Sequence, residues 1–556
     1  MFDIAAKYPA IAELVDMGDS YHKIARVGKG WDLWVLKLTN RARPGGYDRK
    51  GIFFSMFGLH AREYAPPEIG TRMAEYVVQN YGRDADVTAL LDNNELHLLL
   101  LANPDGREIA QDNRSAWWRK NTNFGPNADG RYCGNQFEDG GVDLNRNFDF
   151  MWGDDVGSSS DPCESDFRGS RAFSEPESRA VGDYAREIFP SSQFRSDPEG
   201  RSSIRRERNT DASVGLFVDV HAYGELVISP WGFIDERIPP QNYAAYRALS
   251  HKMCWFNGYK PSASGNKNFL YEVSGGGTDY TWGNLGVPSI LFEVGTSFYP
   301  TCDKFLDKIY PRNLRALLYS ASVSSRPLFI AKGPDVLELK LQPRRVGPRG
   351  EMTVTARVSD DKWSDDIRDA EGRVPSAGQR IEEVRLYVDE YPDYIDTNKN
   401  VRNNVPSSVI RMEKRRSSGT GGGSFFFSSS NEIAVAKVTA STLTRGRHML
   451  CVAAVDAMGY VGSMKCEYFG VGCHPNDCGD GDGEEEEDGD GDGDEEDGGE
   501  DDECSALKKK FQCRKNEGCA WERLARPRGG VTRKKCVKAN AAAAAAATAT
   551  ATRDRI

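Results

Sequence analysis

A histidine and a glutamate stand three residues apart, at His60 and Glu63, directly after the apolar run 51–57. The β-forming residues of this run predict a buried strand, and a helix is expected to begin at about Pro67. Two ligands that follow the end of a strand can reach one ion from adjacent backbone, and nitrogen and oxygen ligands of this kind suit zinc. An isolated histidine–glutamate pair of this spacing is more often part of an ordinary solvated helix edge. A zinc site would also need a third ligand from elsewhere in the chain.

The seven histidines of the chain make the search for that third ligand short. His221 is the strongest candidate, because it ends the apolar run 216–220 and the C-terminal ends of buried strands are where sites form in α/β proteins. His97 lies inside an apolar run and is expected to be a core residue. His60, Glu63 and His221 would leave one position open, which is typical of catalytic zinc. The other histidines are expected on surface helices, in turns or in a second domain: His22, His251, His448 and His474.

Strand-like apolar runs alternate with amphipathic runs over residues 1–329. The alternation predicts an α/β domain with a mostly buried sheet. The expected strands include 34–38, 96–102, 215–220 and 289–292, and the expected helices include 72–81, 175–188, 241–256 and 304–320.

The remaining chain divides into four segments. Short alternating strands without a long helix at 333–472 predict an immunoglobulin-like all-β sandwich of about seven strands. The acidic, glycine-rich segment 473–503 lacks the bounded loop of a calcium site and is expected to be a disordered linker. The segment 504–537 is a small cysteine-rich module that needs disulfides to fold, and 538–556 is a low-complexity tail. The sandwich and the module are candidates for binding other proteins or glycans.

Composition limits the partners and the compartment. The formal net charge of -11 comes largely from the acidic segment, so no nucleic-acid partner is expected for the main body. The 12 cysteines fall into three groups of four, which favours disulfides in an oxidising compartment. The start of the chain has no signal peptide and no run is apolar enough to span a membrane. We therefore expect an extracellular or endomembrane protein whose leader is missing from this sequence, with a cytosolic protein of reduced thiols as the alternative.

Seven motifs in a fixed order connect these observations. They are Gly58 to Glu63, Asn103 to Gly106, Trp118 to Lys120, Gly141 to Phe148, His221 to Tyr223, Tyr271 to Gly276, and Phe292 with Glu293. The series resembles the zinc metallocarboxypeptidases typified by the pancreatic carboxypeptidases A and B, over about residues 8–328. The resemblance implies a mixed, mostly buried β-sheet flanked by helices, and one zinc ion per chain on His60, Glu63 and His221.

The resemblance also implies a reaction, the hydrolysis of the C-terminal peptide bond of peptides or proteins. Glu293 matches the general base of the family and would take the proton of a zinc-activated water. Arg119 matches the arginine that stabilises the oxyanion. Asp143 matches the carboxylate that orients the first zinc histidine through its other ring nitrogen.

Recognition of a free C-terminus follows from the same comparison. Asn145 and Arg146 match the pair that binds the terminal carboxylate, for which arginine supplies two parallel donors. Tyr271 matches a mobile tyrosine that covers the bound carboxylate, and Arg62 is expected to contact substrate further from the cut. Thr278 matches the residue that sets specificity, and a threonine there does not decide between basic and apolar C-termini. Gly232 leaves room in the pocket, so the expected preference is for neutral or apolar residues.

Several alternatives stay open. The chain could be an inactive homologue that binds peptides or matrix, or a relative that acts on small amides or removes glutamate from protein tails, for which Arg205 or Arg206 could supply a cation. Cys133 and Cys163 resemble a bridged pair of the family, and Cys254 with Cys302 is a further candidate pair. The chain begins where mature family members begin, so the inhibitory pro-domain is expected to be absent or cut off.

Overall fold

The computed structural model describes residues 1–42, 50–112, 116–124, 140–154, 156–194, 210–234, 240–263, 271–361, 378–394, 408–415 and 427–473, together with the strands β18 (Cys519–Arg523) and β19 (Lys534–Lys538). Two compact units are present, Met1–Asp482 and Gly483–Ile556. In the second unit β18 pairs antiparallel with β19. The rest of the predicted acidic linker, cysteine-rich module and tail lies outside the described residues, with Arg205 and Arg206.

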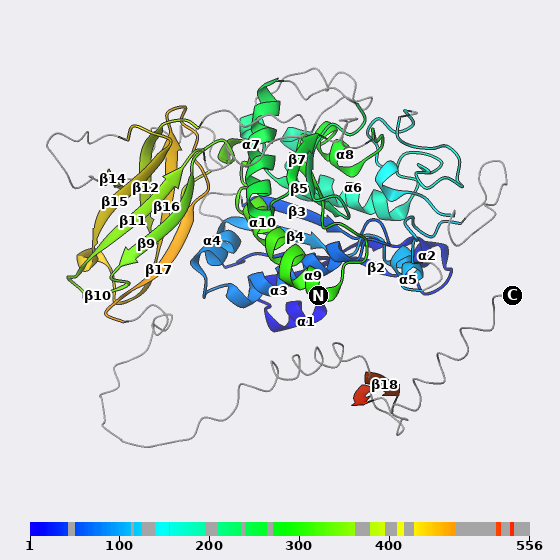
Figure 1. Cartoon of the computed structure of the whole chain (residues 1–556), viewed down its shortest axis with the longest axis horizontal. Helices are drawn as coiled ribbons and strands as arrows, with labels where there is room; N and C mark the ends of the chain where they lie inside the picture. The colour runs from blue at the N-terminus through cyan, green and yellow to red at the C-terminus, as the bar shows by residue number, and fades with distance from the viewer. Residues whose placement is uncertain are drawn as a thin grey trace. The chain divides into compact units, whose positions relative to one another are not determined.

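The first unit is built on an eight-stranded mixed sheet with the order β1-β2-β4-β3-β5-β8-β6-β7 (Figure 1). Its four inner strands β4, β3, β5 and β8 run parallel to one another. The strand β5 is buried at every position, as expected for a parallel strand covered on both faces. The bounds are β1 Ala12–Asp19, β2 Asp32–Leu38, β3 Gly51–Phe57, β4 Asn94–Leu99, β5 Leu216–His221, β6 Leu226–Ser229, β7 Lys260–Ala263 and β8 Ser289–Glu293.

Helices cover this sheet, which confirms the predicted α/β architecture. The helix α10 (Tyr310–Ser322) packs on β3 and β4 and also contacts α3 (Ala65–Asn80) and α7 (Pro240–Asn257). The helix α6 (Pro176–Ile188) lies against β1, and α8 (Gly277–Gly283) packs on β5 and β8. Shorter helices include α1 Phe2–Lys7, α2 Tyr21–Ala25, α4 Ala85–Asn93, α5 Pro104–Ala110 and α9 Cys302–Lys304.

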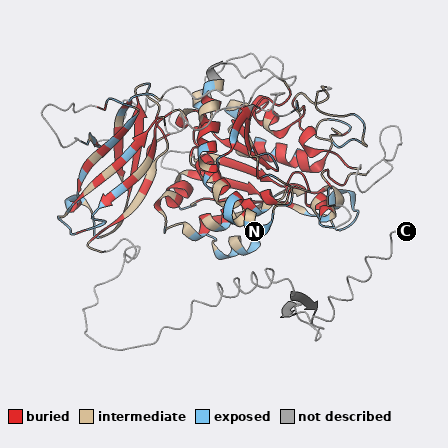
Figure 2. Cartoon of the chain, in the orientation of Figure 1, coloured by how far each residue is buried: buried red, intermediate tan, exposed pale blue. Residues whose placement is uncertain are grey.

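After α11 (Pro327–Ile330) the chain forms strands only, apart from one short 3-10 turn, within the described residues up to 473. They form a five-stranded sheet, β10-β17-β16-β12-β13, and a four-stranded sheet, β14-β15-β11-β9. Inward side chains of both sheets share one core, so the two sheets form a β-sandwich (Figure 2). The strands are β9 Asp335–Gln342, β10 Arg345–Val346, β11 Glu351–Ser359, β12 Ile381–Val388, β13 Ile410–Arg411, β14 Glu413–Lys414, β15 Asn431–Thr439, β16 Gly446–Asp456 and β17 Lys465–Val471.

The cysteines follow the prediction only in part. A disulfide joins Cys451 to Cys466, which face each other on β16 and β17. The suggested pair of Cys254 and Cys302 is wrong, since both thiols are free. Cys254 is buried on α7, whereas Cys302 is exposed at the start of α9. Cys163 is disulfide-bonded, but Cys133 lies outside the described residues, so their pairing stays a prediction.

Among the described helices, none has the length and apolar composition that a membrane span requires.

Candidate active site

Three parallel strands bring the predicted metal ligands to one edge of the sheet. In the register of these strands Phe57 lies opposite Val220, and His221 lies opposite Glu293. The chain then turns at Gly58 with φ +66°, where a Cβ atom would lie 2.9 Å from side-chain atoms of Leu101 and of the nearby Pro67. The carboxyl ends of β3, β5 and β8 therefore place His60, Glu63, His221 and Glu293 side by side.

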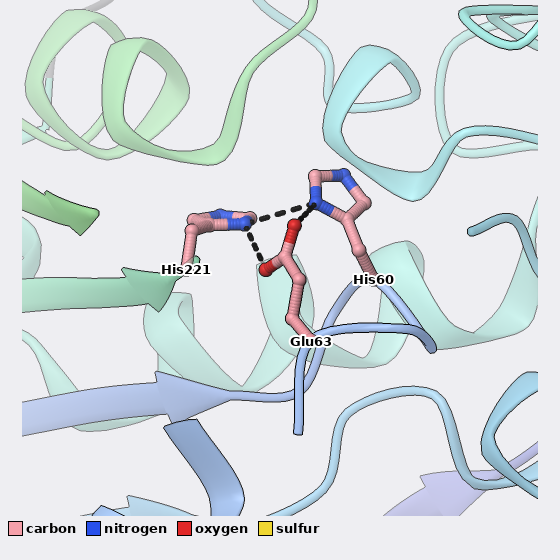
Figure 3. Close-up of side chains that lie close together, drawn as sticks. All are labelled: His60, Glu63 and His221. Atoms are coloured by element: carbon pink, nitrogen blue, oxygen red, sulfur yellow. Dashed lines mark hydrogen bonds and ion pairs between the residues drawn. The ribbon is translucent and has the colours of Figure 1, made fainter. Parts of the chain in front are cut away.

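The three predicted ligands converge on one point (Figure 3). Glu63 Oε1 lies 2.8 Å from His60 Nδ1, and Glu63 Oε2 lies 3.1 Å from His221 Nδ1. The two Nδ1 atoms are 3.0 Å apart. All three side chains are buried, with at most 3% of each residue exposed.

The outer ring nitrogens of both histidines face carboxylates. His60 Nε2 lies 3.1 Å from Asp143 Oδ1, and His221 Nε2 lies 2.8 Å from Asp219 Oδ2. A carboxylate on the outer nitrogen fixes the proton there and leaves Nδ1 as the lone-pair donor. Two lone pairs at 3.0 Å beside a carboxylate need a cation between them, so this donor set fits a divalent metal such as zinc.

Buried charges in this cluster hold one another in their charged forms. Burial alone would raise the pKa of Glu63, but His60 and His221 lower it well below its usual range. Burial would lower the pKa of His221, yet Asp219 and Glu63 raise it well above its ordinary value. Without a metal, His221 thus keeps a proton among these carboxylates, and a cation would take the place of that proton.

Asp143 connects the metal cluster to three donors. Its Oδ2 accepts hydrogen bonds from Arg119 Nε and Nη2 at 3.1 and 3.0 Å, and its Oδ1 accepts one from Asn145 N at 2.9 Å. Burial would raise the pKa of Asp143, but Arg119 and Arg146 bring it well below its usual range. Because Asp143 caps the short helix η1 (Leu144–Arg146), it also fixes the backbone that carries Asn145 and Arg146.

Glu293 stands at the end of β8 beside this cluster. Its Oε2 is shielded from solvent and has no hydrogen-bond partner among the described residues. Burial raises the pKa of Glu293 to about 8, and the charge of Glu63 adds to the shift, whereas His221 and Arg119 oppose it. A carboxylate with one unpartnered oxygen in a cavity can exchange a proton with a bound molecule.

These side chains line a cavity of about 320 Å³. Every predicted site residue lines the cavity except Asp143 and Thr278. Asp143 is fully buried and contacts His60. Thr278 lies half-buried on α8, apart from the lining. The predicted residues that line the cavity are His60, Arg62, Glu63, Arg119, Asn145, Arg146, His221, Tyr271 and Glu293.

The structure adds residues that the sequence did not point to. Asp219 precedes His221 by two positions on β5, so strand alternation places both side chains on one face of the sheet. This spacing is visible in the sequence and could have identified Asp219 as a neighbour of His221. The cavity also has an apolar part formed by Ile228, Val273 and Leu291, and their convergence has no signal in the spacing. One expected surface histidine, His251, is instead fully buried on α7.

Comparisons with known proteins identify the family of this chain. The model of the zinc carboxypeptidase family (peptidase M14) matches residues 1–314, so the chain belongs to this family. Bovine carboxypeptidase A1 is 27% identical over 52% of this chain and 59% of its own length. Metallocarboxypeptidase A of Trichophyton rubrum is 27% identical over 50% of this chain and 57% of its own length. The matched region thus covers less than two thirds of the length of each of these relatives.

Among solved structures, thrombin-activatable fibrinolysis inhibitor is similar, with a TM-score of 0.45 and 21% identity. The match covers 58% of this chain and 72% of that one.

Proposed function

We propose that this protein is a zinc-dependent carboxypeptidase that removes single residues from the C-terminus of peptides or proteins. The observation that supports this most is the buried convergence of His60, Glu63 and His221 beside Glu293. Zinc held by these three residues supplies Lewis-acid polarisation of a carbonyl group and acidifies water. The other steps fall to the protein's own side chains.

Glu293 acts as the general base. It takes a proton from the attacking water and delivers it to the nitrogen of the departing residue. Its Oε2 is suited to this role, since it is shielded from solvent and no described residue forms a hydrogen bond with it. Arg119 stabilises the negative charge that develops on the carbonyl oxygen. Its side chain is held in place by two hydrogen bonds to Asp143, so no reorganisation is needed during the reaction.

Asn145 and Arg146 bind the free carboxylate of the substrate. Arg146 Nε donates to Gly157 O at 2.6 Å and Nη1 to Asn145 O at 2.9 Å, which orients its planar group. Tyr271 is 61% exposed and its ring centroid lies 5.8 Å from Arg146 Cζ, so it can cover a bound carboxylate. A blocked C-terminus has no carboxylate to pair with Arg146, so it would bind more weakly.

The cavity favours neutral or apolar C-terminal side chains. Ile228, Val273 and Leu291 supply its apolar wall, and the carboxylates that line it are Glu63 and Glu293, which belong to the reaction centre. This wall, rather than Thr278, is the basis of the preference that we propose. Removal of glutamate would need a cation beside its side chain, and the arginines among the described lining residues, Arg62, Arg119 and Arg146, have other roles in this proposal.

The test is a peptide panel with Phe, Glu or Lys at the C-terminus, each with a free or an amidated end, incubated with the zinc-loaded protein. We expect release of Phe from free ends only, loss of release with a chelator, and a fall of at least about 10³-fold in kcat for Glu293→Gln. The matched control Glu187→Gln changes an exposed residue on α6. Binding without cleavage would favour the inactive homologue, and cleavage of amidated ends would contradict the mechanism.

Location and partners are further proposals. The Cys451–Cys466 disulfide supports an extracellular or endomembrane location. The immunoglobulin-like character of the sandwich, and binding of proteins or glycans by the sandwich and the cysteine-rich module, stay predictions.

A further inference from the structure

Ser274 lies three residues after Tyr271, in the segment that leads into α8. The residue is 1% exposed and lies outside the described lining of the cavity. Its Oγ lies 2.9 Å from Asp154 O and 2.8 Å from Ser158 Oγ. Because a hydroxyl has a single hydrogen, Ser274 donates to Asp154 O and accepts from Ser158. The hydroxyl thus joins segments that are 116 and 120 positions apart in the sequence.

The partners of Ser274 belong to a segment that also orients Arg146. Its described residues, here called the support segment, are Asp154, Val156, Gly157 and Ser158. Arg146 Nε donates to Gly157 O at 2.6 Å, and Ser274 N donates to Val156 O at 3.1 Å. Ser274 therefore bonds the support segment on both sides of the carbonyl group that Arg146 contacts.

The support segment also touches the backbone next to Tyr271. Gly157 has φ +62°, and a Cβ atom there would lie 1.5 Å from Glu272 O. Only glycine fits this position without a shift of the backbone. One short segment thus contacts both Arg146 and the residue that follows Tyr271.

The residues between Ser274 and α8 are packed against the helix η1. Gly277 N donates a hydrogen bond to Asn145 Oδ1 at 3.0 Å. A Cβ atom on Gly275 would lie 2.2 Å from Arg146 O. Ser274 therefore connects this packing around Asn145 and Arg146 to the support segment.

We propose that Ser274 is a positioning residue for the free carboxylate of the substrate, because its hydroxyl holds the support segment where Gly157 O orients Arg146. The inference rests on the proposed function. Without the hydroxyl, two groups of the support segment lose their partner, and Gly157 O can move away from Arg146 Nε. The guanidinium then loses the fixed plane that a bidentate pair with a carboxylate requires. The proton transfers at Glu293 do not depend on this contact.

The kinetic test uses the zinc-loaded protein and a peptide with a free C-terminal Phe. We expect Ser274→Ala to raise KM about five- to tenfold and to change kcat less than about twofold, since one buried hydrogen-bonding group is lost. Ser158→Ala removes only the donor to Ser274 and should give a smaller rise. The double variant should not exceed Ser274→Ala alone, because both changes break the same contact. The matched control is Ser320→Ala, which removes a buried hydroxyl that donates to Ala316 O at 2.7 Å on α10.

A binding measurement separates this inference from the proposed function. Titration calorimetry of Glu293→Gln compares the same peptide with a free and with an amidated C-terminus, so the ratio of the two affinities reports the contact with Arg146 without cleavage. Adding Ser274→Ala should lower this ratio about five- to tenfold by weakening the free peptide, and adding Ser320→Ala should leave it unchanged. A merely structural role of Ser274 would weaken both peptides equally.

If no peptide is cleaved but Ser274→Ala lowers the affinity ratio, the proposed function fails and the inference stands. If peptides are cleaved as proposed and the ratio is the same with and without the Ser274 hydroxyl, in correctly folded protein, the inference is overturned. Equal weakening of the free and the amidated peptide overturns it as well. Should Ser274→Ala not fold, Ser158→Ala decides, and an unchanged ratio in that variant also overturns the inference.

Discussion

At the scale of single residues, the site depends on carboxylates that do not contact the metal position. Asp143 and Asp219 each face the outer nitrogen of one histidine, so the two Nδ1 atoms point to the same place. Both aspartates are fully buried. Isolated carboxylates are costly to bury, and here the histidines and arginines around them offset that cost.

The role of Asp219 can be tested by Asp219→Asn. The amide keeps the shape but loses the charge that orients His221 and raises its basicity, so we expect zinc affinity to fall about 10- to 100-fold. Competition with a chromophoric chelator measures that affinity without reference to activity. The control Asp183→Asn changes an exposed carboxylate on α6 and should leave it unchanged. Unchanged affinity in Asp219→Asn would show that His221 is oriented without this residue.

Glu293 provides a prediction about pH. Its pKa is raised to about 8 in the metal-free chain, chiefly by burial, so Glu293 should be protonated below that pH and ionised above it. A divalent cation favours the ionised form, so zinc should move the transition to lower pH. The carboxyl stretching band in infrared difference spectra, wild type minus Glu293→Gln, measures both midpoints. A midpoint near the ordinary 4.5 without metal would contradict the burial argument.

At the scale of helices and strands, sequence patterns predict most of the strands that bring the candidate metal ligands together. His60 and His221 follow apolar runs, and the carboxyl ends of parallel strands meet at one sheet edge, so their proximity could be predicted. The apolar wall could not, because Ile228 reaches Leu291 only through the antiparallel pairing of β6 with β8. Nothing in the spacing of these residues specifies that pairing.

The wrong predictions have physical causes as well. A count of cysteines carries no geometry, so Cys254 and Cys302 could not be told from a true pair. From the sequence, His251 is expected on a surface helix, in a turn or in a second domain. The helix α7, which carries His251, instead packs against α10 and α11 and also against β6 and β7, so polar positions on it are buried too.

A buried carboxylate also joins the helix α6 to the segment after β1. Glu177 Oε1 accepts a hydrogen bond from Tyr21 N at 2.7 Å, and Oε2 accepts one from Asn121 Nδ2 at 3.1 Å. Asn121 Nδ2 also donates to Glu175 at 2.7 Å, so two carboxylates share one amide. Burial raises the pKa of Glu177 to about 7, and Glu175 adds to the shift.

The free energy of unfolding should therefore depend on pH through Glu177. Between pH 4.5 and about 7 the unfolded chain ionises Glu177 while the folded chain keeps its proton, so the free energy of unfolding should fall as pH rises. Glu177→Gln should remove about 2–3 kcal/mol of that fall. Urea unfolding of both proteins at pH 4.5 and 7.5 measures the difference. Parallel pH profiles for the two proteins would contradict it.

At the scale of the whole first unit, polar contacts and a shared core join the zinc carboxypeptidase region to the β-sandwich. The core cluster of the first sheet also includes Tyr387, Tyr394 and Val461 of the sandwich region. Tyr391 donates a hydrogen bond to Asp92 at 2.8 Å, and Tyr468 donates one to Thr88 at 2.8 Å. The two regions are therefore expected to unfold together.

The most buried of these contacts is the ion pair of Lys252 on α7 with Asp335 at the start of β9. Lys252 Nζ lies 2.7 Å from Asp335 Oδ2 and donates to Gly333 O at 2.6 Å, and Ser463 donates to Asp335 Oδ1 at 2.6 Å. Exposure is 0% for Lys252 and 2% for Asp335. Removal of one partner leaves the other charge buried and unpaired, which is strongly destabilising.

We expect Asp335→Ala to lower the free energy of unfolding by about 3–5 kcal/mol and to split one thermal transition into two, because the sandwich loses its anchor on α7. Differential scanning calorimetry at one pH and zinc concentration measures both effects. The control Glu351→Ala removes the exposed pair with Lys437, on the sandwich alone, and should cost at most about 1 kcal/mol. If Asp335→Ala unfolds in a single transition at the wild-type temperature, the ion pair does not couple the two regions, and the shared apolar core and the other polar contacts join them.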